Sequence, residues 1–167
     1  MMFDTLGGVA AHPLFVHIPV VLVPLAAIGV VLVAIRPAWF QRFGVVVTIL
    51  AGIGFLGSAF AANTGEQLQE QLLSTGQTPS AALDDHVELG NQVPIYAGIF
   101  FLLTLSWVLF AWWRRRKGDD AVAAKVRKPK AIHMVLAVLA VLSGVVATVT
   151  VTQAGHSGAQ SVWQPKK

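Results

Sequence analysis

The chain has 167 residues, of which 55% are hydrophobic and 12% charged, with a formal net charge of +4, a pI of about 9.9 and a mean hydropathy of +0.67. A mean hydropathy this high excludes an ordinary soluble globular domain. The chain contains no cysteine, which excludes disulfides, thiolate metal ligands and covalent c-type haem attachment.

The apolar residues form four uninterrupted runs. The runs cover about 14–35, 43–62, 93–113 and 131–152, and none contains Lys, Arg, Asp or Glu. Each has about the 20 residues that a helix needs to cross ~30 Å of hydrocarbon. The runs lack the alternating polarity of barrel strands, so helices are favoured. The sequence therefore predicts one all-α membrane domain over 1–167, an integral four-helix up-down-up-down bundle.

Charge is distributed unequally between the two sides that four spans create. Ten of the twelve basic residues fall in the first and third connections: Arg36, Arg42, Arg114, Arg115, Arg116, Lys117, Lys125, Arg127, Lys128 and Lys130. The positive-inside rule therefore predicts that both termini and the connection 63–92 lie outside, in a multi-pass protein of the bacterial inner (cytoplasmic) membrane, N-out and C-out. Trp39, Trp107, Trp112 and Trp113 lie near the inner ends of their runs, as interfacial aromatics do. We expect membrane lipid, and no nucleic acid, as a partner of these basic residues.

The outer connection 63–92 is long enough to hold structure of its own. A short polar helix is predicted over 65–73 and a turn over 77–80. Ser80 is a candidate N-cap, followed by Asp84 in the first turn, so the third helix is predicted to begin well above the membrane.

Four of the five histidines fall on the outer side. His12 and His17 open the first span, His86 lies on the extension of the third, and His156 follows the fourth, while the second span ends at this level with 63–66. Ionisable groups beside hydrocarbon are costly unless partnered, so this layer is the candidate functional site. His133 lies on the other side and is predicted to be a hydrogen-bonded structural residue.

Small residues follow one face of the second span. Gly54, Gly57, Ser58 and Ala61 follow the i, i+3, i+4, i+7 spacing of a helix. This stripe permits close helix packing, or else it leaves a flat slot beside the histidines for the edge of a porphyrin.

Motifs at the span ends resemble a widespread bacterial four-helix integral membrane protein family of unknown function. The resemblance rests on "HPLFVHIPVVL", "ANTGEQ", His86 and "GHSGAQSVW", and covers almost the whole chain. The matching positions are His12, Pro13, His17, Pro19, Gly65, His86, Gly155 and His156. Relatives associated with cytochrome c or Rieske modules imply a place near respiratory electron transfer. Ser157-Gly158-Ala159 departs from the double glycine of many relatives.

Three interpretations of the outer layer remain open. The first is a haem b protein for electron transfer, with His17 and His86 as the favoured ligands and His12 and His156 at a second haem or on propionates. The second is a Cu, Zn or Fe site formed by the four histidines, with Glu66, Asp85 or Glu88 as an auxiliary carboxylate. The third is a structural subunit without a cofactor, whose histidines only cap and pair or, in a variant, relay protons. The scarcity of outer Arg and Lys to pair with propionates counts against the first interpretation.

Hydrolytic motifs are missing from the sequence. Neither Gly-x-Ser-x-Gly nor His-Glu-x-x-His occurs, and Ser157 beside His156 does not by itself form a triad. We therefore expect an electron carrier or a binding protein rather than a hydrolytic enzyme, with a cytochrome c or Rieske protein as the candidate redox partner.

Overall fold

Four long helices make up most of the molecule. The computed structural model describes residues 5–6, 9–76 and 80–163, and the long helices are α1 (Ala11–Ile35), α2 (Pro37–Ser74), α3 (Ala81–Lys117) and α5 (Pro129–Trp163). A short helix, α4 (Asp119–Ala123), follows α3, and strands β1 (Thr5–Leu6) and β2 (Val9–Ala10) pair antiparallel before α1. Each long helix is long and apolar enough to cross a membrane, which confirms the predicted fold class.

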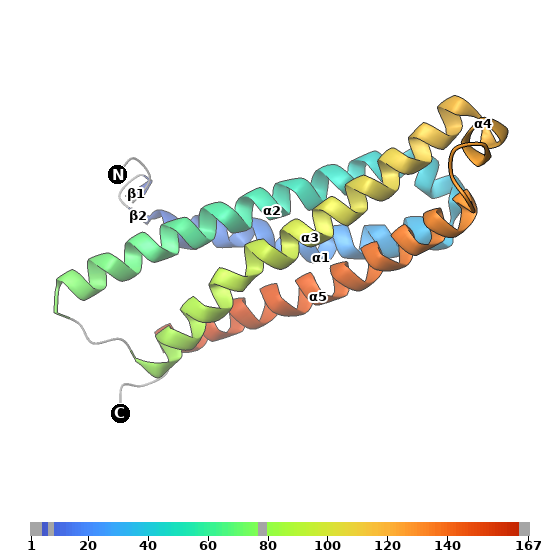
Figure 1. The fold of residues 1–167 in the computed structure, drawn as a ribbon. Helices are drawn as coiled ribbons and strands as arrows, with labels where there is room; N and C mark the ends of the chain where they lie inside the picture. The colour runs from blue at the N-terminus through green and yellow to red at the C-terminus, as the bar shows by residue number, and fades with distance from the viewer. Residues whose placement is uncertain (1–4, 7–8, 77–79, 164–167) are drawn as a thin grey trace.

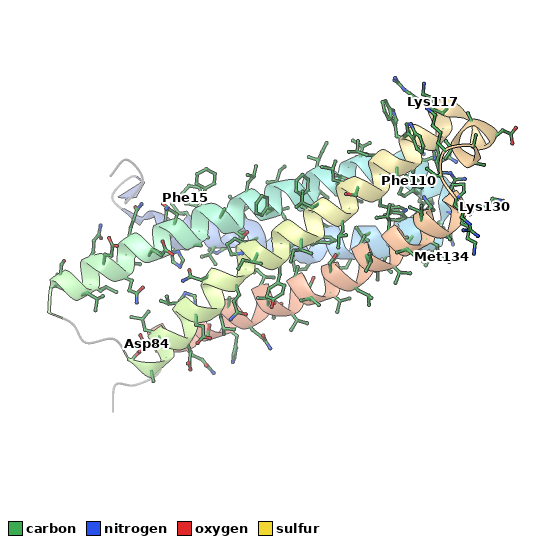
Figure 2. All side chains as sticks on the ribbon, viewed as in Figure 1. Phe15, Asp84, Phe110, Lys117, Lys130 and Met134 are labelled. Atoms are coloured by element: carbon green, nitrogen blue, oxygen red, sulfur yellow. The ribbon has the colours of Figure 1, made fainter. Side chains whose placement is uncertain are left out.

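The long helices lie side by side in an elongated bundle (Figure 1). Helices α1 and α3 each pack against both α2 and α5, so α1 and α3 lie diagonally opposite each other. We call the end that holds the start of α1, the end of α2, the start of α3 and the end of α5 the histidine end. The opposite end, with residues 36–42 and 114–130, is the basic end. Figure 2 shows Asp84 at the histidine end and Lys117 and Lys130 at the basic end.

Helices α2, α3 and α5 extend well beyond the predicted spans. At 1.5 Å per residue, the 38 residues of α2 cover about 57 Å, almost twice the thickness of the hydrocarbon layer. The predicted short helix over 65–73 is therefore wrong, because this segment continues α2. The predicted cap of α3 is confirmed, since Ser80 Oγ accepts a hydrogen bond from the Leu83 amide at 3.3 Å. Within the predicted turn over 77–80, residues 77–79 lie outside the described residues.

Buried positions recur at steps of three and four residues and therefore repeat every seven. This pattern is typical of the left-handed packing of helix bundles. It includes Pro19, Val23, Ala26, Val30 and Val33 in α1; Val93, Ala97, Phe100, Thr104, Trp107 and Ala111 in α3; and Ala140, Gly144, Ala147, Val151 and Ala154 in α5. Trp107 is 2% exposed, so its prediction as an interfacial aromatic is wrong: it lies on this inward face.

The small stripe on α2 serves close packing against α1. A Cβ on Gly54 would lie 3.0 Å from Val23 Cγ2, and a Cβ on Gly57 would collide with Ile18. The sequence left open a flat slot beside this stripe for the edge of a porphyrin. The α1 side chains Val23 and Ile18 fill that space. Outward positions such as Ile28 and Leu102 are more than half exposed, as expected for surfaces that face lipid.

Candidate histidine site

His12 points from α1 to α2. It lies seven residues before the buried Pro19 and therefore continues the inward face of α1. Its Nδ1 lies 2.8 Å from the carbonyl oxygen of Ala61, which accepts a hydrogen bond from this nitrogen. The half-buried ring also covers Gly65, because a Cβ there would lie 3.0 Å from His12 Cε1. The imidazole is thus fixed by the backbone of the neighbouring helix.

His86 points from α3 to α5 in the same way. It lies seven residues before the buried Val93, and its Nδ1 donates to the carbonyl oxygen of Ala154 at 3.0 Å. The hydroxyl of Ser157 lies 3.3 Å from the same nitrogen. A Cβ on Gly158 would lie 2.8 Å from His86 Cε1, so this glycine provides the space for the ring. Both histidines therefore lie against a glycine and bond to a carbonyl of an adjacent helix.

The two rings meet across the diagonal of the bundle. Their centroids are 6.0 Å apart and their planes are inclined by 71°. Because Nδ1 of each neutral ring donates to a carbonyl, Nε2 of each carries the free lone pair. Histidines that bind metals are typically oriented in this way, with the distal nitrogen bonded to a carbonyl or a carboxylate. His12 and His86 together form what we call the diagonal histidine pair.

His17 and His156 lie outside this pair. His17 is exposed and its Nδ1 donates to the carbonyl of Pro13 on its own helix at 2.6 Å. His156 is also exposed, and its Nε2 lies 3.0 Å from Nε2 of Gln160, again on its own helix. Five residues of helix rotate His17 by about 140° from His12, so the two cannot face the same neighbour. His12, rather than the expected His17, is therefore the ring beside His86.

The acidic side chains of the histidine end stay in solvent. Glu66, the expected auxiliary ligand, is exposed on α2. Among the described residues, no group of three or more His, Cys, Asp or Glu side chains lies close enough to hold one metal ion. The converging ligands available there are the two imidazoles of the diagonal pair.

Four contributors to the site were not recognised from the sequence: the Ala61 and Ala154 carbonyls, the Ser157 hydroxyl as a partner of His86, and Gly158. A signal for Gly158 exists, because it follows Gly144 and Val151 in steps of seven along the buried face of α5. No comparable signal identifies the two carbonyl acceptors, since every residue has one.

A family model described as "Predicted membrane protein (DUF2231)" matches residues 8–166. The chain belongs to the DUF2231 family. No curated protein and no solved structure matches it. Membership confirms the expected relation to a family of membrane proteins.

The DUF2231 match contains the whole candidate site. Its range begins before His12 and ends after Gly158, so the diagonal histidine pair and its carbonyl and glycine neighbours all lie within the family domain. In this DUF2231 chain all four long helices contribute to the site: α1 and α3 supply the imidazoles, and α2 and α5 supply the groups that orient them.

Proposed function

We propose that this protein is a membrane b-type haem protein that transfers electrons near the extracytoplasmic face, and that His12 and His86 are the residues that would hold the haem iron. The observation that carries the proposal is the diagonal histidine pair, in which each Nδ1 is bonded to a carbonyl and neither Nε2 has a hydrogen-bond partner among the described residues. Two imidazoles that bind one metal ion through Nε2 at about 2.0–2.1 Å from opposite sides have centroids ~6–6.5 Å apart. The separation of 6.0 Å fits this requirement.

The number of converging ligands favours haem over a bare ion. A structural zinc site takes about four protein ligands, and a catalytic zinc site about three. Haem iron takes its equatorial ligands from the porphyrin and needs at most two from the protein. Two imidazoles converge in the described part of the chain, without a third His, Cys, Asp or Glu within reach.

The residues around the pair suit electron transfer better than substrate chemistry. Haem held by two imidazoles supplies a one-electron redox centre without an open coordination position. Ala61 and Ala154 would hold the rings in the tautomer that binds through Nε2, and Gly65 and Gly158 would keep the positions behind the rings free. Each of these residues therefore has a positioning role.

The charge distribution supports an orientation. The basic end holds ten of the twelve Lys and Arg residues, so the positive-inside rule puts it in the cytoplasm and the histidine end outside, in a bacterial inner membrane. A soluble redox protein, such as a cytochrome c or a Rieske protein, would then reach the haem from the outer face.

The test is the colour of the full chain purified in mild detergent from cells that make haem. We expect a Soret band that sharpens on reduction with dithionite and is lost in both His12→Ala and His86→Ala. The matched controls His17→Ala and His156→Ala remove exposed imidazoles at the same end and should keep the band. Circular dichroism of each variant shows whether it is folded.

Two results would contradict the proposal. A colourless wild-type protein excludes haem; copper, zinc or iron found by elemental analysis of that sample would then indicate a bare ion, and no metal would indicate a structural subunit. A red protein that loses its colour in His17→Ala but keeps it in His12→Ala would assign the ligands differently.

A further inference from the structure

A cavity lies at the basic end, opposite the end that holds the diagonal histidine pair. The four long helices surround a partly open cavity of about 380 Å³ there. Its walls include Phe40, Gln41, Trp107, Arg114, Arg115 and His133. Cavities of this size are typical of small-ligand sites.

His133 lines this cavity and has an unused, buried hydrogen-bond donor next to it. The indole N–H of Trp107 donates to His133 Nε2 at 3.3 Å, so the proton of the neutral ring is on Nδ1. Nδ1 is buried and has no hydrogen-bond partner among the described residues. The ring cannot turn freely, because Phe40 packs against it edge-on at 5.6 Å and Trp107 packs at 5.7 Å. A buried donor without a partner is costly, and a ligand acceptor would remove that cost.

The charge of the cavity has one sign. Arg114 and Arg115 bring two guanidinium groups to its wall, and none of the described lining residues is Asp or Glu. Guanidinium groups match the geometry of phosphate oxygens and bind them with charge-assisted hydrogen bonds.

We propose that this cavity binds a phosphate group, with Arg115 and the Nδ1–H of His133 among its donors. The phosphate belongs either to the headgroup of an anionic lipid or to free phosphate. Basic pockets between membrane helices at the cytoplasmic side are typical sites for anionic headgroups. The site does not depend on the haem proposal, since its residues lie at the other end of every long helix.

The main experiment compares two neighbouring arginines of the full chain in detergent. Arg115 lines the cavity, whereas the guanidinium of Arg116 lies 4.1 Å from the ring centroid of Trp112, which is exposed. Arg115→Gln and Arg116→Gln therefore remove the same charge from adjacent positions. Native mass spectrometry measures binding of dioleoyl phosphatidylglycerol, and phosphorus NMR measures binding of inorganic phosphate in a separate arm.

We expect saturable binding in at least one arm. Arg115→Gln should weaken it about tenfold, and Arg116→Gln should leave it within about twofold. Binding of the lipid alone identifies a headgroup site, and binding in both arms identifies a site that also takes free phosphate. Equal losses in the two variants, or no saturable binding in either arm, would overturn the proposal.

A second pair of variants keeps the test decisive if Arg115→Gln does not fold. His133→Gln retains an acceptor near the Nε2 position for Trp107 but removes the donor at Nδ1, whereas His133→Asn retains a donor near Nδ1. We expect His133→Gln to weaken phosphate binding about threefold to tenfold more than His133→Asn does. The opposite order would contradict the role given to Nδ1.

Discussion

Glycines determine where the two imidazoles of the diagonal pair can lie. His86 Cε1 occupies the space where a side chain at position 158 would begin, and His12 lies almost as close to Gly65. Each ring also bonds to a carbonyl of the helix that carries its glycine: His86 to that of Ala154 on α5, and His12 to that of Ala61 on α2. The site therefore depends on residues without side chains as much as on the histidines.

We expect Gly158→Ala to destabilise the protein by about 1–3 kcal/mol. The new Cβ would lie 2.8 Å from His86 Cε1, so the ring must move and its bond to the Ala154 carbonyl must lengthen or break. Alanine normally stabilises a helix by ~1 kcal/mol relative to glycine. We expect the displacement of the His86 ring to cost more than this gain, so that the net effect is a loss of stability. Thermal unfolding in detergent, followed by circular dichroism, measures the change.

Gly90→Ala is the matched control. Gly90 lies in α3 four residues after His86, and apart from the nearby backbone of its own helix no described atom lies within 4 Å of a Cβ added there. This variant should be neutral or stabilised by up to about 1 kcal/mol. If both variants were stabilised equally, the close contact between Gly158 and His86 would be disproved.

At the scale of the elements, the end of an apolar run does not mark the end of its helix. The second run ends near residue 62, but α2 continues to Ser74 because the following Gln, Glu and Leu residues are good helix formers. The change in composition indicates where the helix leaves the hydrocarbon. Because the helices continue beyond their apolar runs, His12, His86 and the groups that they contact lie in one layer at the histidine end.

Contact between α1 and α2 is close enough to exclude a single methyl group. Gly57→Ala would place a Cβ against Ile18 and Pro19, and we expect a loss of about 1–3 kcal/mol in unfolding free energy. Gly155→Ala is the control on α5, where the nearest atom, Val20 Cγ2, lies 3.8 Å from the added Cβ. Unfolding in mixtures of SDS and mild detergent measures the unfolding free energy of both variants. If Gly57→Ala lost less unfolding free energy than Gly155→Ala, the close packing of α1 against α2 would be disproved.

At the scale of the whole molecule, the two ends differ in charge and in chemistry. The histidine end has exposed carboxylates, including Glu70, Asp84 and Asp85, whereas the basic end has a cavity lined by arginines. At the basic end, Arg36 and Arg116 lie over Trp39 and Trp112, which are exposed. Pairs of this kind anchor helices at the level of lipid headgroups. The bundle therefore has two distinct faces, one on each side of the membrane that it spans.

The chain has no cysteine, so its orientation can be measured with single introduced thiols. We expect Glu70→Cys, at the histidine end, to react with a membrane-impermeant maleimide in intact spheroplasts. Lys125→Cys, at the basic end, should react only after the membrane is permeabilised, because the positive-inside rule puts it in the cytoplasm. Both positions are exposed, so accessibility within the protein does not limit labelling. The reverse pattern would invert the orientation and move the proposed haem to the cytoplasmic side.

The sequence by itself determined that four helices cross the membrane, since apolar runs of this length must satisfy their backbone hydrogen bonds internally. It also determined the Ser80 cap, whose hydrogen bond is local. The seven-residue spacing also indicates that His12, His86 and His133 face inward. Trp107, which its place near the end of a run predicts to be interfacial, follows the same spacing and is buried.

Only the tertiary structure decided which groups meet. His12 and the Ala61 carbonyl are 49 residues apart in the chain, and His86 and the Ala154 carbonyl are 68 apart. Their contact depends on the rotation of each helix and on which helices are diagonal, and these follow from how side chains and glycines pack throughout the bundle. Periodicity indicates the inward face of a helix, but packing selects the residue opposite it.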